Sequence, residues 1–202
     1  MLGFVTPPDV SKSFKVPPGG HGVWPIPEHR RPWIYNSGVN EREPARAAGA
    51  STYGRDDPPQ AQLAATVASC LALINSRFPE DGDRGAAAML LADGTILTGT
   101  SPEAMNASVE VCHEIEPYCG AYRLNQRVVA SVCLHRQAGG RTVVLSPCGV
   151  CRERLAVYGP GVLVAVADRS DPTVVVWKPL KDVLPDYWMT AFPDEIDAGW
   201  IT

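Results

Sequence analysis

The chain has 202 residues, 45% of them hydrophobic, and a formal net charge of −4. That length is enough for one hydrophobic core of ordinary size with an appendage. The acidic balance lies in residues 60–202, which carry 11 Lys and Arg against 16 Asp and Glu, whereas residues 1–59 carry 7 against 6. Because proteins that grip phosphate backbones do so with basic surface, this balance argues against a nucleic-acid partner.

The sequence also argues against a membrane or secreted protein. No apolar run approaches the ~20 residues that a membrane-spanning helix needs. The N-terminus lacks a basic region followed by a long apolar region, so it does not resemble a secretory signal. The six cysteines fit a reducing compartment better than a disulfide framework. We therefore expect a cytoplasmic protein without a membrane partner.

Residues 1–59 form a Pro- and Gly-rich extension that holds 10 of the 19 prolines and shows no sustained apolar period. This composition predicts a largely irregular segment, although Trp24, Trp33 and Tyr35 leave open that it docks on a surface. The expected organisation is an N-terminal extension over residues 1–59, a folded domain over 60–190 and a C-terminal tail over 191–202.

The first half of the folded domain reads as a helix, a hairpin and a second helix. Apolar residues recur every three or four positions from Gln60 to about Arg77, which predicts one helix with one buried face. Residues 85–91 and 95–99 flank Asp93-Gly94, a dipeptide typical of a β-hairpin turn. A loop over 100–111 then leads to a helix that we expect to start near Cys112 and to run to about Leu124.

The second half alternates strands with short helices. Strands are predicted over 128–134, 141–145, 161–167 and 173–177, and short helices from Cys148 to Gly159 and over 180–184. The tail after Pro185 is expected to be irregular. This alternation predicts an α/β fold with one mixed sheet covered by helices.

Two short stretches carry the chemistry, Cys112-His113-Glu114 and residues 147–151, which read Pro-Cys-Gly-Val-Cys. Cys148 and Cys151 can place two thiolates on one metal ion, and Cys112 supplies a third. Three protein ligands leave the fourth tetrahedral position of Zn²⁺ open for water, as in catalytic rather than structural sites. Zinc makes that water acidic enough to react at neutral pH. The sequence therefore predicts Zn²⁺ as the cofactor.

Glu114 is placed to move protons at this centre. A non-ligand Glu two residues after the first ligand, with Pro-Cys-x-x-Cys later in the chain, is the arrangement of zinc deaminases. A redox pair or half of a structural zinc knuckle remains an alternative interpretation of a Cys-x-x-Cys motif. A closed structural site would need a fourth ligand, for which His113 and His135 are the candidates.

With these motifs the chain resembles the cytidine deaminase family. It resembles in particular the small class with three cysteine ligands, which includes nucleoside cytidine deaminases and blasticidin-S deaminases. Cys112-His113-Glu114 lies where that family has Cys-Ala-Glu, and residues 146–152 are close to its Pro-Cys-Gly-x-Cys-Arg. Residues 180–188 look like the Leu-Leu-Pro-x-x-Phe end of the nucleoside enzymes. The resemblance covers roughly residues 60–188. It implies a three-layer αβα sandwich around a mixed five-stranded sheet, one zinc per subunit and a homotetramer.

The resemblance also indicates where the substrate site departs from the family. The nucleoside enzymes hold the ribose with the Asn and Glu of Gly-x-Asn-x-Glu-Asn, and an ungapped alignment to Cys112 places Ser101 on that Asn and Glu103 on that Glu. Ser101 and Glu103 are therefore the candidate substrate-binding residues. The aromatic residue that the family has before the first strand is missing, and His113 replaces a small Ala. Arg152 is expected to offset the net charge of −1 that three thiolates and Zn²⁺ carry.

The leading functional hypothesis is hydrolytic deamination of a cytosine-type base in a free nucleoside or nucleoside-like compound, with Glu114 as the catalytic residue. One alternative is a toxin-like cytosine deaminase acting on nucleic acid, with residues 1–59 as an attachment arm. The other is a non-catalytic, zinc-stabilised binding module. Glu114 and the lack of an evident fourth ligand count against the binding module.

Overall fold

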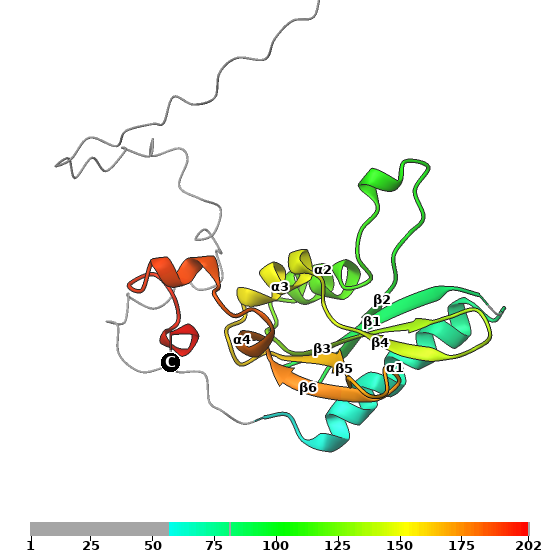
Figure 1. Cartoon of the computed structure of the whole chain (residues 1–202), viewed down its shortest axis with the longest axis horizontal. Helices are drawn as coiled ribbons and strands as arrows, with labels where there is room; N and C mark the ends of the chain where they lie inside the picture. The colour runs from blue at the N-terminus through cyan, green and yellow to red at the C-terminus, as the bar shows by residue number, and fades with distance from the viewer. Residues whose placement is uncertain (1–56, 81, 202) are drawn as a thin grey trace, which may run out of the picture. The chain divides into compact units, whose positions relative to one another are not determined.

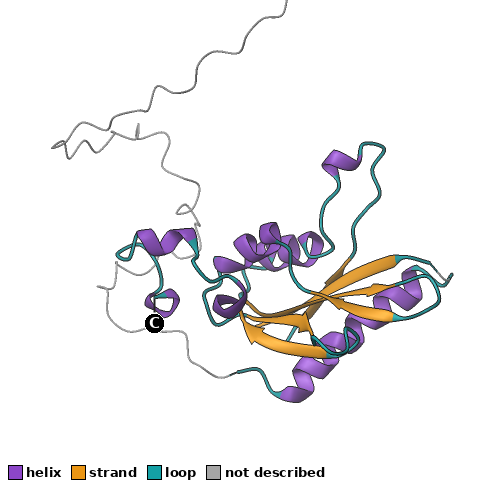
Figure 2. Cartoon of the chain, viewed as in Figure 1, coloured by secondary structure: helices purple, strands orange, loops and turns teal. Residues whose placement is uncertain are grey.

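The computed structural model describes residues 57–80 and 82–201. These residues form a mixed sheet with helices on both faces (Figure 1), and Figure 2 shows the same arrangement by element type. Helix α1 (Gln60–Arg77) covers one face, and α2 (Ile115–Arg123) and α3 (Gly149–Ala156) cover the other. The predicted three-layer α/β architecture is confirmed. The interpretation of residues 1–59 as an irregular extension falls, up to residue 56, outside the described residues.

The sheet has six strands, one more than the resemblance implies. They are β1 (Arg84–Leu91), β2 (Ile96–Gly99), β3 (Val128–Arg136), β4 (Thr142–Leu145), β5 (Leu163–Ala167) and β6 (Val175–Pro179). The order is β2-β1-β3-β5-β6, a path of five strands, and β4 pairs separately with β3. Strands β4 and β5 can both pair with β3 because β3 is long. The last residues of β3 pair with β4, and its earlier residues Ala130 and Ser131 pair in parallel with β5. All other pairs are antiparallel.

Helix α1 has the bounds that the apolar period predicts. Its buried residues Leu63, Thr66, Cys70 and Ile74 follow one another at three- and four-residue steps, which puts them on one helical face. Thr66 is tolerated there because its hydroxyl donates to the carbonyl of Gln62 at 2.8 Å. Buried apolar side chains of α1 pack on one face of the sheet, together with Ala86, Ala88, Val132, Leu134, Val144 and Ala165.

Strand β1 lies between β2 and β3 in the sheet and is buried on both faces from Gly85 to Leu91. This burial explains its near-continuous apolar sequence, which lacks the alternation of a half-exposed strand. The run of three alanines lets α1 approach closely, and the Cys70 thiol donates to the carbonyl of Ala86 at 3.1 Å. The hairpin turn to β2 is confirmed: Gly94 has φ +87°, a conformation that favours glycine.

The opposite face carries the second core cluster, in which Met89 and Leu91 of β1 meet Ala121 of α2 and Leu155 of α3. Helix α4 (Leu180–Val183) adds the fully buried Leu180 to the same cluster. This packing holds α2 and α3 side by side on one face. The residues just before their first turns, Cys112 and Cys148, are thereby brought into contact.

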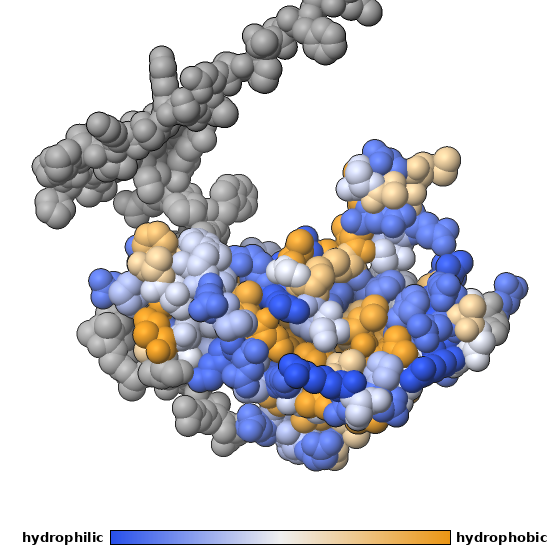
Figure 3. Space-filling model, viewed as in Figure 1, coloured by the Kyte–Doolittle hydropathy of each residue, from blue (hydrophilic) through white to orange (hydrophobic). Residues whose placement is uncertain are grey.

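The loop between β2 and α2 projects from the body of the domain, with a 3₁₀ turn (Ala107–Val109) near its tip (Figure 1). Figure 3 shows hydrophobic residues among hydrophilic ones at this tip, and Met105 and Val109 are largely exposed. None of the helices in the described part of the chain has the length and apolar character needed to cross a bilayer.

The tail is more ordered than its irregular sequence suggests. It forms two 3₁₀ turns, η4 (Trp188–Ala191) and η5 (Ala198–Trp200). The rings of Trp200 and Tyr187 lie 4.7 Å apart, and Met189 and Ile196 also pack against the core cluster of α2 and α3. The tail therefore packs on the domain through the apolar side chains of Met189, Ile196 and Trp200.

Candidate active site

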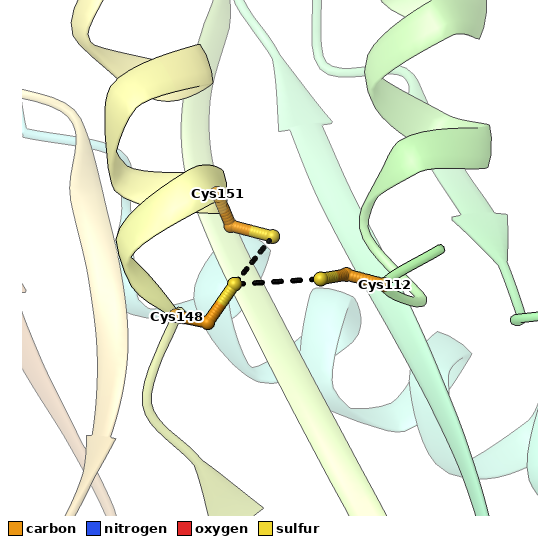
Figure 4. A group of neighbouring side chains, drawn as sticks. All are labelled: Cys112, Cys148 and Cys151. Carbon is orange, nitrogen blue, oxygen red and sulfur yellow. Dashed lines mark hydrogen bonds between the residues drawn. The ribbon is translucent and has the colours of Figure 1, made fainter. Parts of the chain in front are cut away.

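Three cysteines meet where α2 and α3 begin (Figure 4). The Sγ atoms of Cys112 and Cys148 lie 3.3 Å apart, and those of Cys148 and Cys151 lie 3.5 Å apart. All three sulfurs lie within 4.8 Å of one another. Thiolates at a Zn–S distance of about 2.3 Å in a tetrahedron would lie about 3.8 Å apart. The donor set therefore fits one zinc ion after small outward movements of the side chains.

The helix starts make one of these thiols more acidic than the others. Burial works to raise the pKa of Cys148, but the nearby backbone N–H groups of Cys151 and Val150 and the neighbouring thiols outweigh it, so the pKa is lowered. Burial raises the pKa of Cys112 and, more strongly, that of Cys151. Cys148 is consequently the thiol that is most readily a thiolate, as expected beside the first turn of a helix.

A fourth protein ligand is not part of this cluster. Among the described residues, the only group of three or more possible metal ligands is Cys112, Cys148 and Cys151. The two histidines that the sequence left open are engaged elsewhere: His113 Nδ1 accepts from the Ser101 backbone, and His135 Nε2 lies 3.7 Å from Asp83. Three donors with no fourth side chain are what an open, catalytic zinc site requires.

Glu114 directly precedes helix α2 and is buried, with 6% of its surface exposed. Burial raises the pKa of its carboxyl above the usual 4.5, and the Cys151 thiol and the charge of Arg154 offset this only in part. A carboxyl with a raised pKa is better suited to accept a proton and release it again at neutral pH. The structure thus places a buried carboxyl beside the cysteine cluster, with the Cys151 thiol as a hydrogen-bond partner.

The sequence reasoning did not anticipate what the ring of His113 does. Its Nδ1 accepts a hydrogen bond from the backbone N–H of Ser101 at 2.8 Å. Its other edge lies against Gly85, where an added Cβ would come within 2.4 Å of Nε2. Burial, with the charge of His135 adding to it, lowers the pKa of His113, so the ring is neutral at neutral pH. Two features of the sequence together could have indicated this contact. They are the bulky His113 within Cys112-His113-Glu114 and Gly85 at the start of β1.

A cavity of about 870 Å³ opens beside this ring. His113 and both candidate sugar ligands, Ser101 and Glu103, contribute to its wall. Glu103 is mostly exposed and lies 3.4 Å from Arg84. The structure thus brings Ser101 and Glu103, near the start of the loop between β2 and α2, beside His113 at the end of the same loop.

Arg152 lies on α3, one residue after the last cysteine. Its Nε donates to the carbonyl of Pro147 and its Nη1 to the carbonyl of Val183, each at 2.7 Å. These two bonds tie the start of α3 to the end of α4. The expectation that Arg152 offsets the charge of the thiolates stays a prediction.

The chain is similar to cytidine deaminases of known structure. The chain is similar to the cytidine deaminase from Bacillus anthracis, with 38% identity and a TM-score of 0.63 over 69% of this chain and 98% of that one. It is also similar to the cytidine deaminase from Mycobacterium tuberculosis, with 29% identity and a TM-score of 0.41 over 54% of this chain and 81% of that one. No family model and no curated protein matches the sequence. Nearly the whole Bacillus anthracis protein is covered at 38% identity, and the cysteine cluster fits the three-cysteine zinc class. The chain belongs to the cytidine deaminase family.

Proposed function

We propose that the protein is a zinc-dependent hydrolase that deaminates a cytosine-type base in a free nucleoside, cytidine or deoxycytidine, or in a nucleoside-like compound. The observation that carries the proposal is the placement of three thiols and one buried carboxyl, Glu114, at the start of two helices. The 38% identity to a cytidine deaminase supports the same reaction class.

Cys112, Cys148 and Cys151 would hold the zinc ion. When bound there, zinc supplies a water acidified for nucleophilic attack at neutral pH. As the water oxygen attacks C4 and makes it tetrahedral, Glu114 accepts a proton from the water and delivers it to N3 of the ring. Glu114 then carries the remaining proton of the water, from the new C4 hydroxyl, to the exocyclic amine, and the C4–N bond breaks to release ammonia. The burial that raises the pKa of this carboxyl makes both the uptake and the release of a proton accessible.

The sugar would occupy the cavity beside His113. Ser101 and Glu103 line it, and both can bond hydroxyl groups: Glu103 as an acceptor, Ser101 as a donor or an acceptor. Ser101 is shorter than the Asn of the family pattern and has no amide, so the contact with the sugar is expected to differ there. The expectation that an aromatic residue before β1 is missing is wrong, because Phe78 precedes β1 and lines this same cavity.

A tetrameric, cytoplasmic salvage enzyme is part of this proposal. The family resemblance supports the tetramer, and the projecting loop, which exposes Met105 and Val109, supplies apolar surface of the kind that subunits bury. The six cysteines support a reducing compartment.

The experiment is ammonia release from a panel of cytidine, deoxycytidine, cytosine, blasticidin S and a short single-stranded oligonucleotide, with Glu114→Gln as the control. Release from a nucleoside that disappears in Glu114→Gln, with zinc content unchanged, is the expected result. Release from the oligonucleotide alone would establish the polymer-acting alternative. One bound zinc with no release from any substrate would contradict the proposal and favour a binding module.

A further inference from the structure

The loop that carries the candidate sugar ligands is held at its start by three hydrogen bonds to two other segments. The Thr100 hydroxyl donates to the carbonyl of Gly85 at 2.8 Å, and its backbone N–H donates to Glu116 Oε2 at 3.0 Å. The next residue, Ser101, donates its backbone N–H to His113 Nδ1 at 2.8 Å. The bond to His113 is therefore the one of the three that lies nearest along the chain to the Ser101 hydroxyl and Glu103.

The ring of His113 also packs against β1. It lies on Gly85, the one residue type that leaves room, because a Cβ there would lie 2.4 Å from Nε2 and 2.8 Å from Cδ2. Residues 85 and 101 both line the cavity, as does His113 itself. The ring thus fills the space between β1 and the loop and leaves Nδ1 facing the Ser101 amide.

Because Nδ1 accepts this hydrogen bond, the proton of the neutral ring lies on Nε2. To keep the hydrogen bond from the Ser101 N–H, a side chain at position 113 needs an acceptor atom two bonds beyond Cβ, which is the position of Nδ1 in His113. The Oδ1 atom of an asparagine occupies the same position, whereas the Oε1 of a glutamine lies one bond further out. Asn and Gln carry the same amide group, so they separate the position of the acceptor from its chemistry.

We propose that His113 is a positioning residue that fixes the Ser101–Glu103 segment against the metal motif, and that it thereby sets the affinity for the sugar of the substrate. The positioning of the Ser101–Glu103 segment concerns the chain alone. The effect on sugar affinity rests on the proposed function, since it takes a nucleoside as the substrate. His113 sits between Cys112 and Glu114, so the contact links the reacting end of the site to its sugar end.

The test compares His113→Ala, His113→Gln and His113→Asn in the zinc-loaded, full-length protein. Amide hydrogen exchange of the peptide that contains residues 100–104 is measured without substrate, and kcat and KM are measured with the best substrate of the panel. We expect faster exchange and about a fivefold to tenfold rise in KM in Ala and Gln, the loss that one hydrogen bond of ordinary strength represents. We expect kcat to stay within about a factor of two, and Asn to restore both exchange and KM.

Several results would overturn the proposal. They are unchanged exchange in His113→Ala, an Asn variant no better than Gln, a fall in kcat at constant KM, or loss of zinc from His113→Ala. Loss of zinc would mean that the ring supports Cys112 rather than the loop. The exchange measurement needs no turnover, so it decides the positioning role even if every nucleoside proves inert. Failure of the proposed function and failure of this inference are therefore distinguishable.

Discussion

Replacing Gly99 with alanine should destabilise the domain, because the end of β2 lies against the first turn of α2. An ideal Cβ at Gly99 would lie 2.4 Å from Cδ of Pro117 and 2.6 Å from Cβ of Glu116. Neither atom is the mobile end of a flexible side chain, so relief of the clash requires movement of backbone. Overpacking of this kind costs about 1–3 kcal/mol, and for a domain of this size each kcal/mol lowers the melting temperature by about 2–4 °C.

The free energy of unfolding is measured by urea denaturation of the zinc-loaded protein, with the melting temperature as a second readout. Gly161→Ala is the matched control, because a Cβ there meets nothing within 4 Å and the backbone is outside the left-handed region. The control should be neutral or slightly stabilising, since alanine reduces the freedom of the unfolded chain. A Gly99→Ala protein as stable as the wild type, or a control that loses as much stability, would refute the reasoning from close packing.

The remaining predictions concern the site. Glu114→Gln should keep its zinc, measured by metal analysis, and lose about 10²–10⁴-fold in kcat, the range for a general acid-base group; an active, zinc-loaded variant would remove Glu114 from that role. The pKa of Glu114 is raised in the folded state, so its ionisation costs stability as the pH rises above the usual 4.5. Metal-free Glu114→Gln should therefore gain stability over the wild type at pH 7 and lose that gain below pH 4.5, as urea titrations at several pH values would show; a gain independent of pH would contradict this. In the metal-free protein, iodoacetamide should alkylate Cys148 before Cys151, because Cys148 is exposed with a lowered pKa and Cys151 is buried with a raised one; peptide mass spectrometry reads the order, and the reverse order would count against the helix-start argument. Gly85→Ala should displace the His113 ring and speed exchange of residues 100–104 as His113→Ala does; unchanged exchange would show that the ring moves at no cost to the loop.

Local sequence patterns were enough to predict most elements, because those elements depend on neighbours within a few residues. The apolar period from Gln60 places α1, and its bounds match the structure. Asp93-Gly94 predicts the hairpin because only a residue tolerant of positive φ fits there, and Gly94 has φ +87°. The metal-site motifs were likewise readable, since Cys-x-x-Cys brings two thiols together within one turn of chain.

The relation between segments far apart in the chain could not be predicted in the same way. Nothing in the spacing of Cys112 and Cys148 brings their sulfurs to 3.3 Å; the packing of α2 and α3 on one face of the sheet does so. The sharing of β3 between β4 and β5 depends on the same long-range packing, and so does the contact between the rings of Trp200 and Tyr187 that attaches the tail. Sequence alone therefore determined the fold class and the candidate ligands, because these rest on local period and residue chemistry. Only the tertiary structure decided that His113 contacts Ser101 and Gly85, because that contact exists only once β1, the loop and the start of α2 are packed together.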